Sequence, residues 1–350
     1  MSTSLPSTSF TGLIDLLSES LGGRALWCTD DFFASMHNLV KPGRGVFLPD
    51  EYTDRGKWMD GWESRRKRVP GHDTCVLQLG VSGAIRALDI DTNHFLGNHP
   101  PFASLEAARA PGLGEAPSAD DLERLEWIEL LPQSPLRPGS QNLFAVRNPN
   151  AFTHVRLHIY PDGGVARLRA WGEVEPSWDP PVLDDASKPH VRQGAVDLAA
   201  VVNGGRALAC SDAFFGPMDN LLLPGRAVNM GGGWETKRKR PAPGHDWILL
   251  RLGDRGTLET LEIDTNHFKG NYPDRVAVRG IDAPLSRLTE LIDPRVTYET
   301  VLPETHLEAH TRHFFTKELE ARGPFSHLRV EVFPDGGISR FRGWGHREVA

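Results

Sequence analysis

The sequence has few cysteines and no long apolar run. Its three cysteines, Cys28, Cys75 and Cys210, are an odd and sparse set in 350 residues, which argues against a disulfide framework and favours a reducing compartment. No apolar run approaches the roughly eighteen residues of a membrane helix. The N-terminus lacks the charged and apolar regions of a signal peptide. The sequence therefore predicts a cytoplasmic protein without a membrane segment.

The chain also lacks a dominant charge of one sign. It has 39 Lys and Arg against 46 Asp and Glu, a formal net charge of -7, and a hydrophobic content of 39%. These values are typical of a folded globular protein and not of a disordered or nucleic-acid-binding chain. Basic runs at residues 65–68 and 237–240 each precede a Pro and a Gly-His-Asp turn. This context favours a solvated surface or an anionic ligand over nucleic acid.

What the sequence does contain is one long internal repeat. The stretch Ala-Leu-Asp-Ile-Asp-Thr-Asn-His-Phe-Leu-Gly-Asn at residues 87–98 recurs almost unchanged at residues 261–271. A chain of this length is too long for a typical single core. The repeat divides it into a first copy at 1–175, an extended linker rich in Pro and Asp at 176–192, and a second copy at 193–350.

Short alternating segments separated by Gly and Pro predict β-strands in both copies. Residues 152–172 read as two strands around a Pro-Asp-Gly-Gly turn, which we interpret as a hairpin. Residues 13–20 and 311–321 are expected to form short helices. A Leu-Pro pair is expected to end the strands at 126–131 and 297–302. The pattern indicates an all-β fold with one jelly-roll β-sandwich of about eight strands per copy and a few short helices.

A cluster of polar side chains ends the repeated strand. Apolar and acidic residues alternate in this strand, so Asp91 leaves the sheet on the face opposite the core. Thr92, His94 and Asn98 follow directly. Such residues often tie down loop backbone through their side chains, but their repetition in the second copy favours a functional site.

A second polar pattern follows the Pro-Asp-Gly-Gly turn. Arg167, Arg169 and Trp171 share one face of their strand. Stacked side chains on a solvated sheet face explain this stripe as well as a ligand does. The strand before the turn is expected to direct its apolar side chains into the core: Val155, Leu157 and Ile159.

Several motifs together resemble the allantoicase family. They include Gly-Gly-Arg-Ala-Leu at 22–26, Gly-Trp-Glu-Ser-Arg-Arg-Lys-Arg at 61–68, Ile-Asp-Thr-Asn-His-Phe-Leu-Gly-Asn at 90–98 and Tyr-Pro-Asp-Gly-Gly-Val at 160–165. The resemblance extends over almost the whole chain. It implies two jelly rolls of the galactose-binding-domain type. It also implies a hydrolase acting on a carbon–nitrogen bond, which converts allantoate to ureidoglycolate and urea in purine (allantoin) degradation.

Allantoate has a central carbon that carries a carboxylate, a hydrogen and two ureido groups. Its hydrolysis needs a proton on the departing urea and a water activated at that carbon. We assign His94 as proton donor or acceptor and Asp91 as the group that orients it or activates water, with His267 and Asp264 as counterparts. Arg68 or Arg240 would bind the substrate carboxylate. The side chains expected to bind the substrate are Glu63, Arg68, His72, Thr92, Asn98, Glu235, Arg240, His245, Thr265 and Asn271.

Three further expectations concern ligands and partners. No tight His spacing marks a metal site, so no metal ligand is assigned, although an imidazole with carboxylates could hold a divalent metal such as Mn. Allantoate is the expected partner, with no nucleic acid and no membrane, and a homo-oligomer is expected. The alternative function is a non-catalytic tandem carbohydrate-binding module, which requires an exposed aromatic platform such as Trp62, Trp171 or Trp234.

Overall fold

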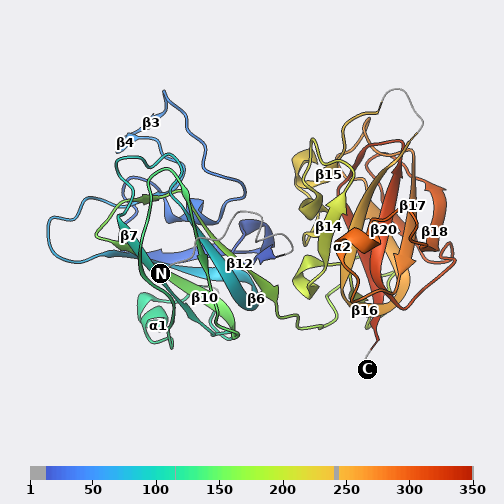
Figure 1. Cartoon of the computed structure of the whole chain (residues 1–350), viewed down its shortest axis with the longest axis horizontal. Coiled ribbons are helices and arrows are strands. Elements are labelled where there is room, and N and C mark those ends of the chain that lie inside the picture. The colour runs from blue at the N-terminus through green and yellow to red at the C-terminus, as the bar shows by residue number, and fades with distance from the viewer. Residues whose placement is uncertain (1–12, 115, 240–243, 349–350) are drawn as a thin grey trace. The chain divides into compact units, whose positions relative to one another are not determined.

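The computed structural model describes residues 13–114, 116–239 and 244–348. The chain divides into two compact units, Met1–Glu175 and Pro176–Ala350. Each contains one eight-stranded sheet, and the order of strands is the same in both (Figure 1). The predicted all-β fold with two tandem sandwich repeats and short helices is confirmed. No helix in the described residues is long and apolar enough to cross a membrane.

The elements of the first unit are mostly strands. The strands of its main sheet are β1 (Ile14–Asp15), β2 (Arg24–Cys28), β6 (Asp73–Asp91), β7 (Phe102–Ala108), β8 (Ile128–Pro135), β9 (Gln141–Ala145), β10 (Ala151–Tyr160) and β12 (Arg167–Val174). Two small pairs are formed by β3 (Tyr52–Thr53) with β4 (Gly56–Lys57) and by β5 (Trp62–Glu63) with β11 (Gly164–Val165). The helices are η2 (Glu19–Leu21), η3 (Met36–Val40) and α1 (Ala119–Glu123).

The second unit repeats this plan. The strands of its main sheet are β13 (Val196–Asp197), β14 (Arg206–Cys210), β16 (Asp246–Asp264), β17 (Arg275–Ile281), β18 (Glu299–His306), β19 (Arg312–Phe315), β20 (Phe325–Phe333) and β22 (Arg340–Arg347). The small pair is β15 (Trp234–Glu235) with β21 (Gly337–Ile338). The helices are η4 (Val201–Asn203), η5 (Met218–Leu222), η6 (Met230–Gly232) and α2 (Leu288–Leu291).

The long strand β6 belongs to both layers of the first sandwich. Its first half pairs with β2 and β10, and its second half pairs with β9 and β12. Asp73 lies opposite Ile159 at the end of β10, and Asp91 lies opposite Arg167 at the start of β12. Only a short connection separates Ile159 from Arg167. Both ends of β6 therefore lie at the same end of the sandwich, which we call the loop end.

The predicted hairpin at 152–172 is wrong in its pairing. Strands β10 and β12 each pair with β6 and not with each other, and Figure 1 shows β6 beside both. The Pro-Asp-Gly-Gly connection carries the chain from one layer to the other. The same connection in the second unit joins β20 to β22, which both pair with β16. Alternation predicts the strands but does not identify their partners.

The hydrophobic cores form as the alternation predicts. The three side chains of β10 predicted to face the core, Val155, Leu157 and Ile159, are fully buried. Trp62 and Trp234 are also fully buried. Their indole nitrogens donate to the backbone oxygens of Asp30 and Asp212 at 2.8 and 2.9 Å. A buried indole with a hydrogen-bonded nitrogen is a stable way to fill a large core position.

Three secondary-structure predictions are wrong. Residues 13–20 form β1 and the start of η2, and the segment at 311–321 contains β19 instead of a helix. The strands at 128–135 and 299–306 continue past Pro132 and Pro303. Each is the last strand in its sheet order, so a missing N–H costs no ladder hydrogen bond on the open side.

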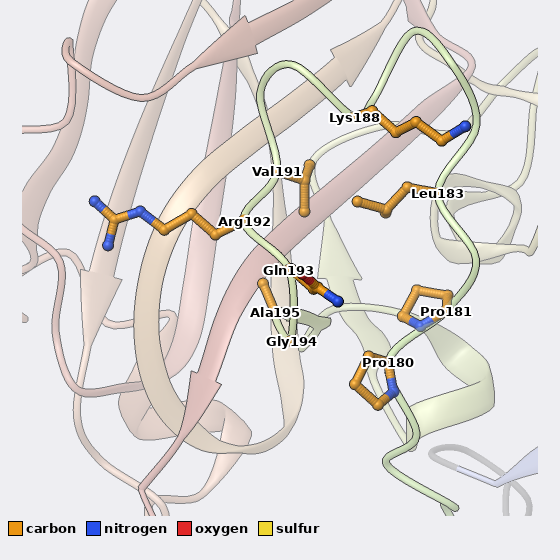
Figure 2. A pocket seen from close by; sticks show the side chains of 9 residues that line it. All are labelled: Pro180, Pro181, Leu183, Lys188, Val191, Arg192, Gln193, Gly194 and Ala195. Carbon is orange, nitrogen blue, oxygen red and sulfur yellow. The ribbon is translucent and has the colours of Figure 1, made fainter.

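The segment at 176–192 also differs from the extended linker that its composition predicts. Leu183 packs on a small apolar cluster of Val191, Ala195 and Trp344. This segment lines one side of a cavity of about 420 Å³, and Figure 2 shows the side chains that surround it. Thr260 donates to the backbone oxygen of His190 at 2.8 Å. The segment is therefore packed against the second sandwich.

Candidate functional site

An arginine and an aspartate form the centre of the site in the first unit. Asp91 is the last residue of β6 and is only 2% exposed. Arg44 donates from Nε to Asp91 Oδ2 at 2.9 Å and from NH2 to Asp91 Oδ1 at 2.8 Å. The hydrogen-bonded carboxylate raises the pKa of Arg44, so the guanidinium stays charged. Half of the Arg44 side chain remains exposed and can meet a ligand.

His94 is held beside this pair in an uncommon backbone conformation. Its φ is +68°, in the left-handed region that non-glycine residues rarely adopt. Its Nε2 lies 3.2 Å from the backbone oxygen of Gly45, which also accepts from Asn93 Nδ2 at 2.9 Å. Because a carbonyl only accepts, Nε2 carries the proton and Nδ1 is left as an acceptor in the neutral ring. Backbone strain of this kind is often associated with functional sites.

The second unit reproduces the same network. Arg226 binds Asp264 through Nε at 2.9 Å and NH2 at 3.2 Å. His267 has a φ of +71°, and its Nε2 lies 2.9 Å from the backbone oxygen of Ala227. The Asn266 side chain donates to the same oxygen at 3.2 Å. We call each set, Arg44, Asp91 and His94 or Arg226, Asp264 and His267, the Arg–Asp–His site.

Two predicted roles at this site change. Asp91 does not orient His94, because its carboxylate holds Arg44 and the backbone N–H of Asn93. The Gly45 carbonyl orients the imidazole instead. The hydroxyls of Thr92 and Thr265 are fully buried and donate to backbone oxygens at 2.6 and 2.7 Å. These threonines fasten the loop and are not accessible to a substrate.

A carboxylate–amide pair lies at the same loop end. Asn98 Nδ2 donates to Glu63 Oε1 at 2.7 Å, and Asn271 Nδ2 donates to Glu235 Oε1 at 2.5 Å. Burial raises the pKa of Glu63, partly opposed by the Asn98 hydrogen bond. The structure thus brings together two predicted residues that are 35 positions apart in sequence. The short loop from His94 to Asn98 connects this pair to the Arg–Asp–His site.

The two Gly-His-Asp histidines join a different network. His72 Nε2 lies 3.2 Å from His158 Nδ1. His245 Nε2 lies 3.8 Å from a carboxylate oxygen of Glu331. Each histidine directly precedes the first residue of its long strand, and their partners differ between the units. We therefore leave His72 and His245 out of the proposed site.

The arginine of the Arg–Asp–His site is not the one that the sequence predicted to bind the substrate carboxylate. Arg68 is exposed in the connection between β5 and β6, and Arg240 lies outside the described residues. Arg44 and Arg226 were not among the predicted residues. The Pro-Gly-Arg motif that precedes each sandwich's long loop occurs in both copies, and this repetition was the available signal.

The stripe of arginines on β12 is not a solvated face. Arg167 and Arg169 are only 3% and 8% exposed. Arg167 NH2 donates to Asp60 Oδ2 at 2.7 Å, and Arg169 NH2 donates to the backbone oxygens of Lys41 and Gly43. These bonds hold residues 41–45 against the sheet. Because this segment carries Arg44 and Gly45, the buried arginines position the Arg–Asp–His site.

The equivalent face of the second unit is partly open. A cavity of about 150 Å³ is lined by Arg226 and Asp264 and by arginines of β19 and β22. Asp184 from the segment before the second sandwich closes one side, with its carboxylate 2.7 Å from Arg312. Space for a small polar ligand therefore exists over this face.

The structure also bears on the metal and carbohydrate expectations. Among the described residues, no group of three or more His, Cys, Asp or Glu side chains is arranged to hold a metal ion. Trp62 and Trp234 are fully buried. They cannot provide the exposed aromatic platform that the carbohydrate-binding alternative requires.

The fold is a tandem β-sandwich, and each sandwich carries the same Arg–Asp–His network at its loop end. The allantoicase repeat model matches residues 14–175 and 196–348. A Burkholderia mallei relative named "Probable allantoicase 1" is 44% identical over 332 residues, which cover 95% of this chain and 94% of that protein. The crystal structure of allantoicase from Saccharomyces cerevisiae is 32% identical and covers 99% of this chain and 100% of that one, with a TM-score of 0.80.

The chain belongs to the allantoicase family and is a hydrolase of purine degradation. A "Probable allantoicase" from Pseudomonas fluorescens strain SBW25 is also 44% identical, over 333 residues that cover 95% of this chain and 96% of that protein. The resemblance seen in the sequence motifs is confirmed, and the carbohydrate-binding alternative is not favoured.

Proposed function

We propose that this chain hydrolyses allantoate to ureidoglycolate and urea at the Arg–Asp–His site. The supporting observation is that both units build the same network from segments far apart in sequence. Arg44 and Asp91 are 47 residues apart, and Arg226 and Asp264 are 38 apart. The same strained histidine lies beside each pair. Folding alone does not require a left-handed histidine twice.

The arginine supplies the cation for the substrate carboxylate. Nε and NH2 of Arg44 bind Asp91, so NH1 can donate to an anionic group at the exposed side of the guanidinium. The Asp91 carboxylate fixes the plane of the guanidinium, which gives the ligand a pre-oriented donor. Arg226 presents the same geometry over Asp264.

The histidine supplies the base. His94 Nδ1 accepts a proton from water, and the water oxygen bonds to the central carbon of allantoate. The bond from this carbon to one ureido nitrogen breaks, its electron pair stays on the nitrogen, and a proton is delivered there. The two hydrogens and the oxygen of one water are thereby divided between ureidoglycolate and urea.

The carboxylate–amide pair suits a ureido group. Glu63 offers acceptors for the N–H groups of urea, and the Asn98 side chain offers a donor and an acceptor. A partly buried carboxylate that already has one amide partner is prepared to bind a second. We propose that Glu63 and Asn98, with Glu235 and Asn271 in the second unit, bind the ureido groups.

The test measures products from allantoate. Purified protein is expected to release equal amounts of urea and ureidoglycolate. The variant His94→Asn/His267→Asn keeps a residue type that tolerates the left-handed conformation and is expected to lose at least about 100-fold in kcat. Full activity of this double variant would remove imidazole catalysis. Activity after exhaustive chelation, with Mn added back, decides whether a divalent metal takes part.

We also propose a cytoplasmic location and a homo-oligomer. The three cysteines form no disulfide, which is consistent with a reducing compartment. Exposed phenylalanine pairs occur in both units, and Phe214 and Phe215 are 65% and 59% exposed. Association would cover such apolar surface. Sedimentation velocity tests this point, and a strictly monomeric species would contradict it.

A further inference from the structure

One acidic position differs in its surroundings between the two units. Asp89 on β6 and Glu262 on β16 occupy equivalent places, two residues before the aspartate of the Arg–Asp–His site. Both face away from the core on the same side as that aspartate. Asp89 is 3% exposed and Glu262 is 2% exposed. Each is therefore a buried carboxyl on the same strand as the aspartate of the Arg–Asp–His site.

Asp89 has a neutral partner only. Its Oδ2 accepts from Gln141 Nε2 at 2.7 Å. Its Oδ1 is buried and has no hydrogen-bond partner within the described ranges. An unsatisfied buried carboxylate oxygen is costly, whereas a protonated carboxyl can be tolerated. This position can therefore hold a proton.

Glu262 is fully engaged. Arg312 donates to its Oε1 from Nε at 2.9 Å and from NH2 at 2.7 Å. The Trp344 indole donates to its Oε2 at 3.2 Å. Arg312 lies opposite Asp264 on β19, where Gln141 lies opposite Asp91 on β9. The exchange of glutamine for arginine converts a site that can hold a proton into an ion pair.

Charged groups of both signs surround the Asp89 carboxyl. Asp91 lies on the same strand face, Arg169 lies opposite on β12, and Arg44 approaches from the loop. Arg169 is shared with Asp15, whose Oδ2 is 3.4 Å from NH1. Burial raises the pKa of Asp89 to about 7, opposed first by the Gln141 hydrogen bond. A group that gains and loses a proton near neutral pH suits proton transfer.

We propose that Asp89 is the proton-transfer group of the first sandwich, and that the second sandwich, in which Arg312 holds Glu262, binds allantoate but does not hydrolyse it. This inference rests on the proposed function. The protonated Asp89 carboxyl delivers its proton to the ureido nitrogen that leaves. His94 takes a proton from the attacking water. The imidazolium returns one proton to Asp89 through solvent after product release, so charge and atoms balance over one cycle.

The first experiment compares matched isosteric variants in the full chain. Asp89→Asn is expected to lower kcat by at least about 100-fold with KM changed less than about threefold, because an amide cannot donate an acidic proton. Glu262→Gln is expected to stay within about twofold of the unchanged protein. The kcat–pH profile of the unchanged protein should show an inflection near neutral pH that Asp89→Asn lacks. Asp89→Glu should restore part of the activity and the inflection.

The second experiment exchanges the neighbour of Asp89. Gln141→Arg gives the first unit an arginine at the position that Arg312 occupies in the second. This cation should stabilise ionised Asp89, lower kcat at least about tenfold and move the inflection of the kcat–pH profile to lower pH. Arg295→Gln, at an exposed arginine of the second unit that pairs with Asp293, is the control and should leave kcat unchanged. Thermal unfolding of each variant separates loss of fold from loss of proton transfer.

Two results would overturn the inference. Asp89→Asn with unchanged kcat and an unchanged pH profile would remove proton transfer by this residue. An equal loss in Glu262→Gln would show that both sandwiches turn over. In both cases the unchanged protein still releases urea from allantoate. Absence of urea release from the unchanged protein would instead contradict the proposed function.

Discussion

The two sandwiches keep one network and change most of what surrounds it. The Arg–Asp–His sites match in bonded atoms and backbone conformation. By contrast, the first unit inserts the β3–β4 pair into the loop after Arg44, where the second has the single turn of η6. The geometry of the site is thus insensitive to the loop that follows it. The two copies are therefore alike in the site and in the sheet that carries it, and they differ in the loop.

The outer face near the start of the long strand shows the opposite behaviour. In the first unit His158 contacts Thr74 at 2.9 Å and Glu106 at 2.9 Å. In the second unit the counterpart of His158 is Glu331, which binds Arg279 at 3.0 Å. A histidine–glutamate contact is replaced by a glutamate–arginine contact while the strands remain in register. This face therefore requires hydrogen-bonded pairs of side chains, but not particular residues.

The largest expected effect tests whether the two cores are equivalent. Trp62→Ala and Trp234→Ala each empty a fully buried position and leave a backbone carbonyl without its indole donor. Each should lower the free energy of unfolding by about 3–5 kcal/mol. Differential scanning calorimetry should show that Trp62→Ala shifts only the transition of the first unit. Equal shifts of one shared transition would show that the units unfold together.

The next effect concerns the site arginines. Arg44→Ala removes the cation and leaves the buried Asp91 without its charged partner. We expect KM to rise at least about tenfold and the free energy of unfolding to fall by about 1–3 kcal/mol. Arg226→Ala should lower the stability of the second unit as much as Arg44→Ala lowers that of the first, but it should change turnover less. Lysine at position 44 is the control, because it keeps the charge without the fork of donors.

Local sequence was sufficient to find part of this site. Asp91, His94 and Asn98 lie within eight residues, and strand alternation places the aspartate outside the core. Their repetition distinguishes them from ordinary loop residues. The core-facing residues of β10 follow from the same alternation. Both predictions depend on relationships between near neighbours in sequence.

The rest required knowledge of which distant segments meet. Arg44 is 47 residues from Asp91, and nothing between them indicates the pairing. Arg167 and Arg169 were assigned with equal weight to a solvated face because their strand alternates correctly. Arg169 binds the loop that covers it through the backbone carbonyls of Lys41 and Gly43. A backbone carbonyl leaves no trace in side-chain pattern, so this layer could not be predicted.

A buried histidine should make the stability of the second unit depend on pH. Burial lowers the pKa of His327 to about 4. In the unfolded chain this histidine titrates near 6.5, so below that pH the unfolded state binds a proton that the native state does not. The second unit should therefore lose stability as pH falls from about 6.5 to about 4. His327→Gln should flatten this dependence in unfolding titrations, and an unchanged slope would exclude this histidine as the cause.

Asp89 gives the first unit a dependence of the other sign. Its native pKa of about 7 lies above the unfolded value of about 3.9. Between these values the native state holds a proton that the unfolded chain has released. Stability of the first unit should therefore fall as pH rises from about 4 to about 7. Asp89→Asn should abolish this fall, measured by urea unfolding at several pH values, and Glu262→Gln serves as the matched control.

The smallest expected effect comes from the segment before the second sandwich. Lys188 pairs with Asp185 at 2.7 Å, but the side chains are 60% and 97% exposed. Exposed pairs of this kind contribute less than about 0.5 kcal/mol, so Lys188→Ala should leave the transition of the second unit unchanged within error. Ser187→Ala in the same segment is the contrast, because its buried hydroxyl accepts from Arg312 at 2.8 Å. A larger loss in Ser187→Ala would show that buried contacts, and not surface charge, fasten this segment to the second unit.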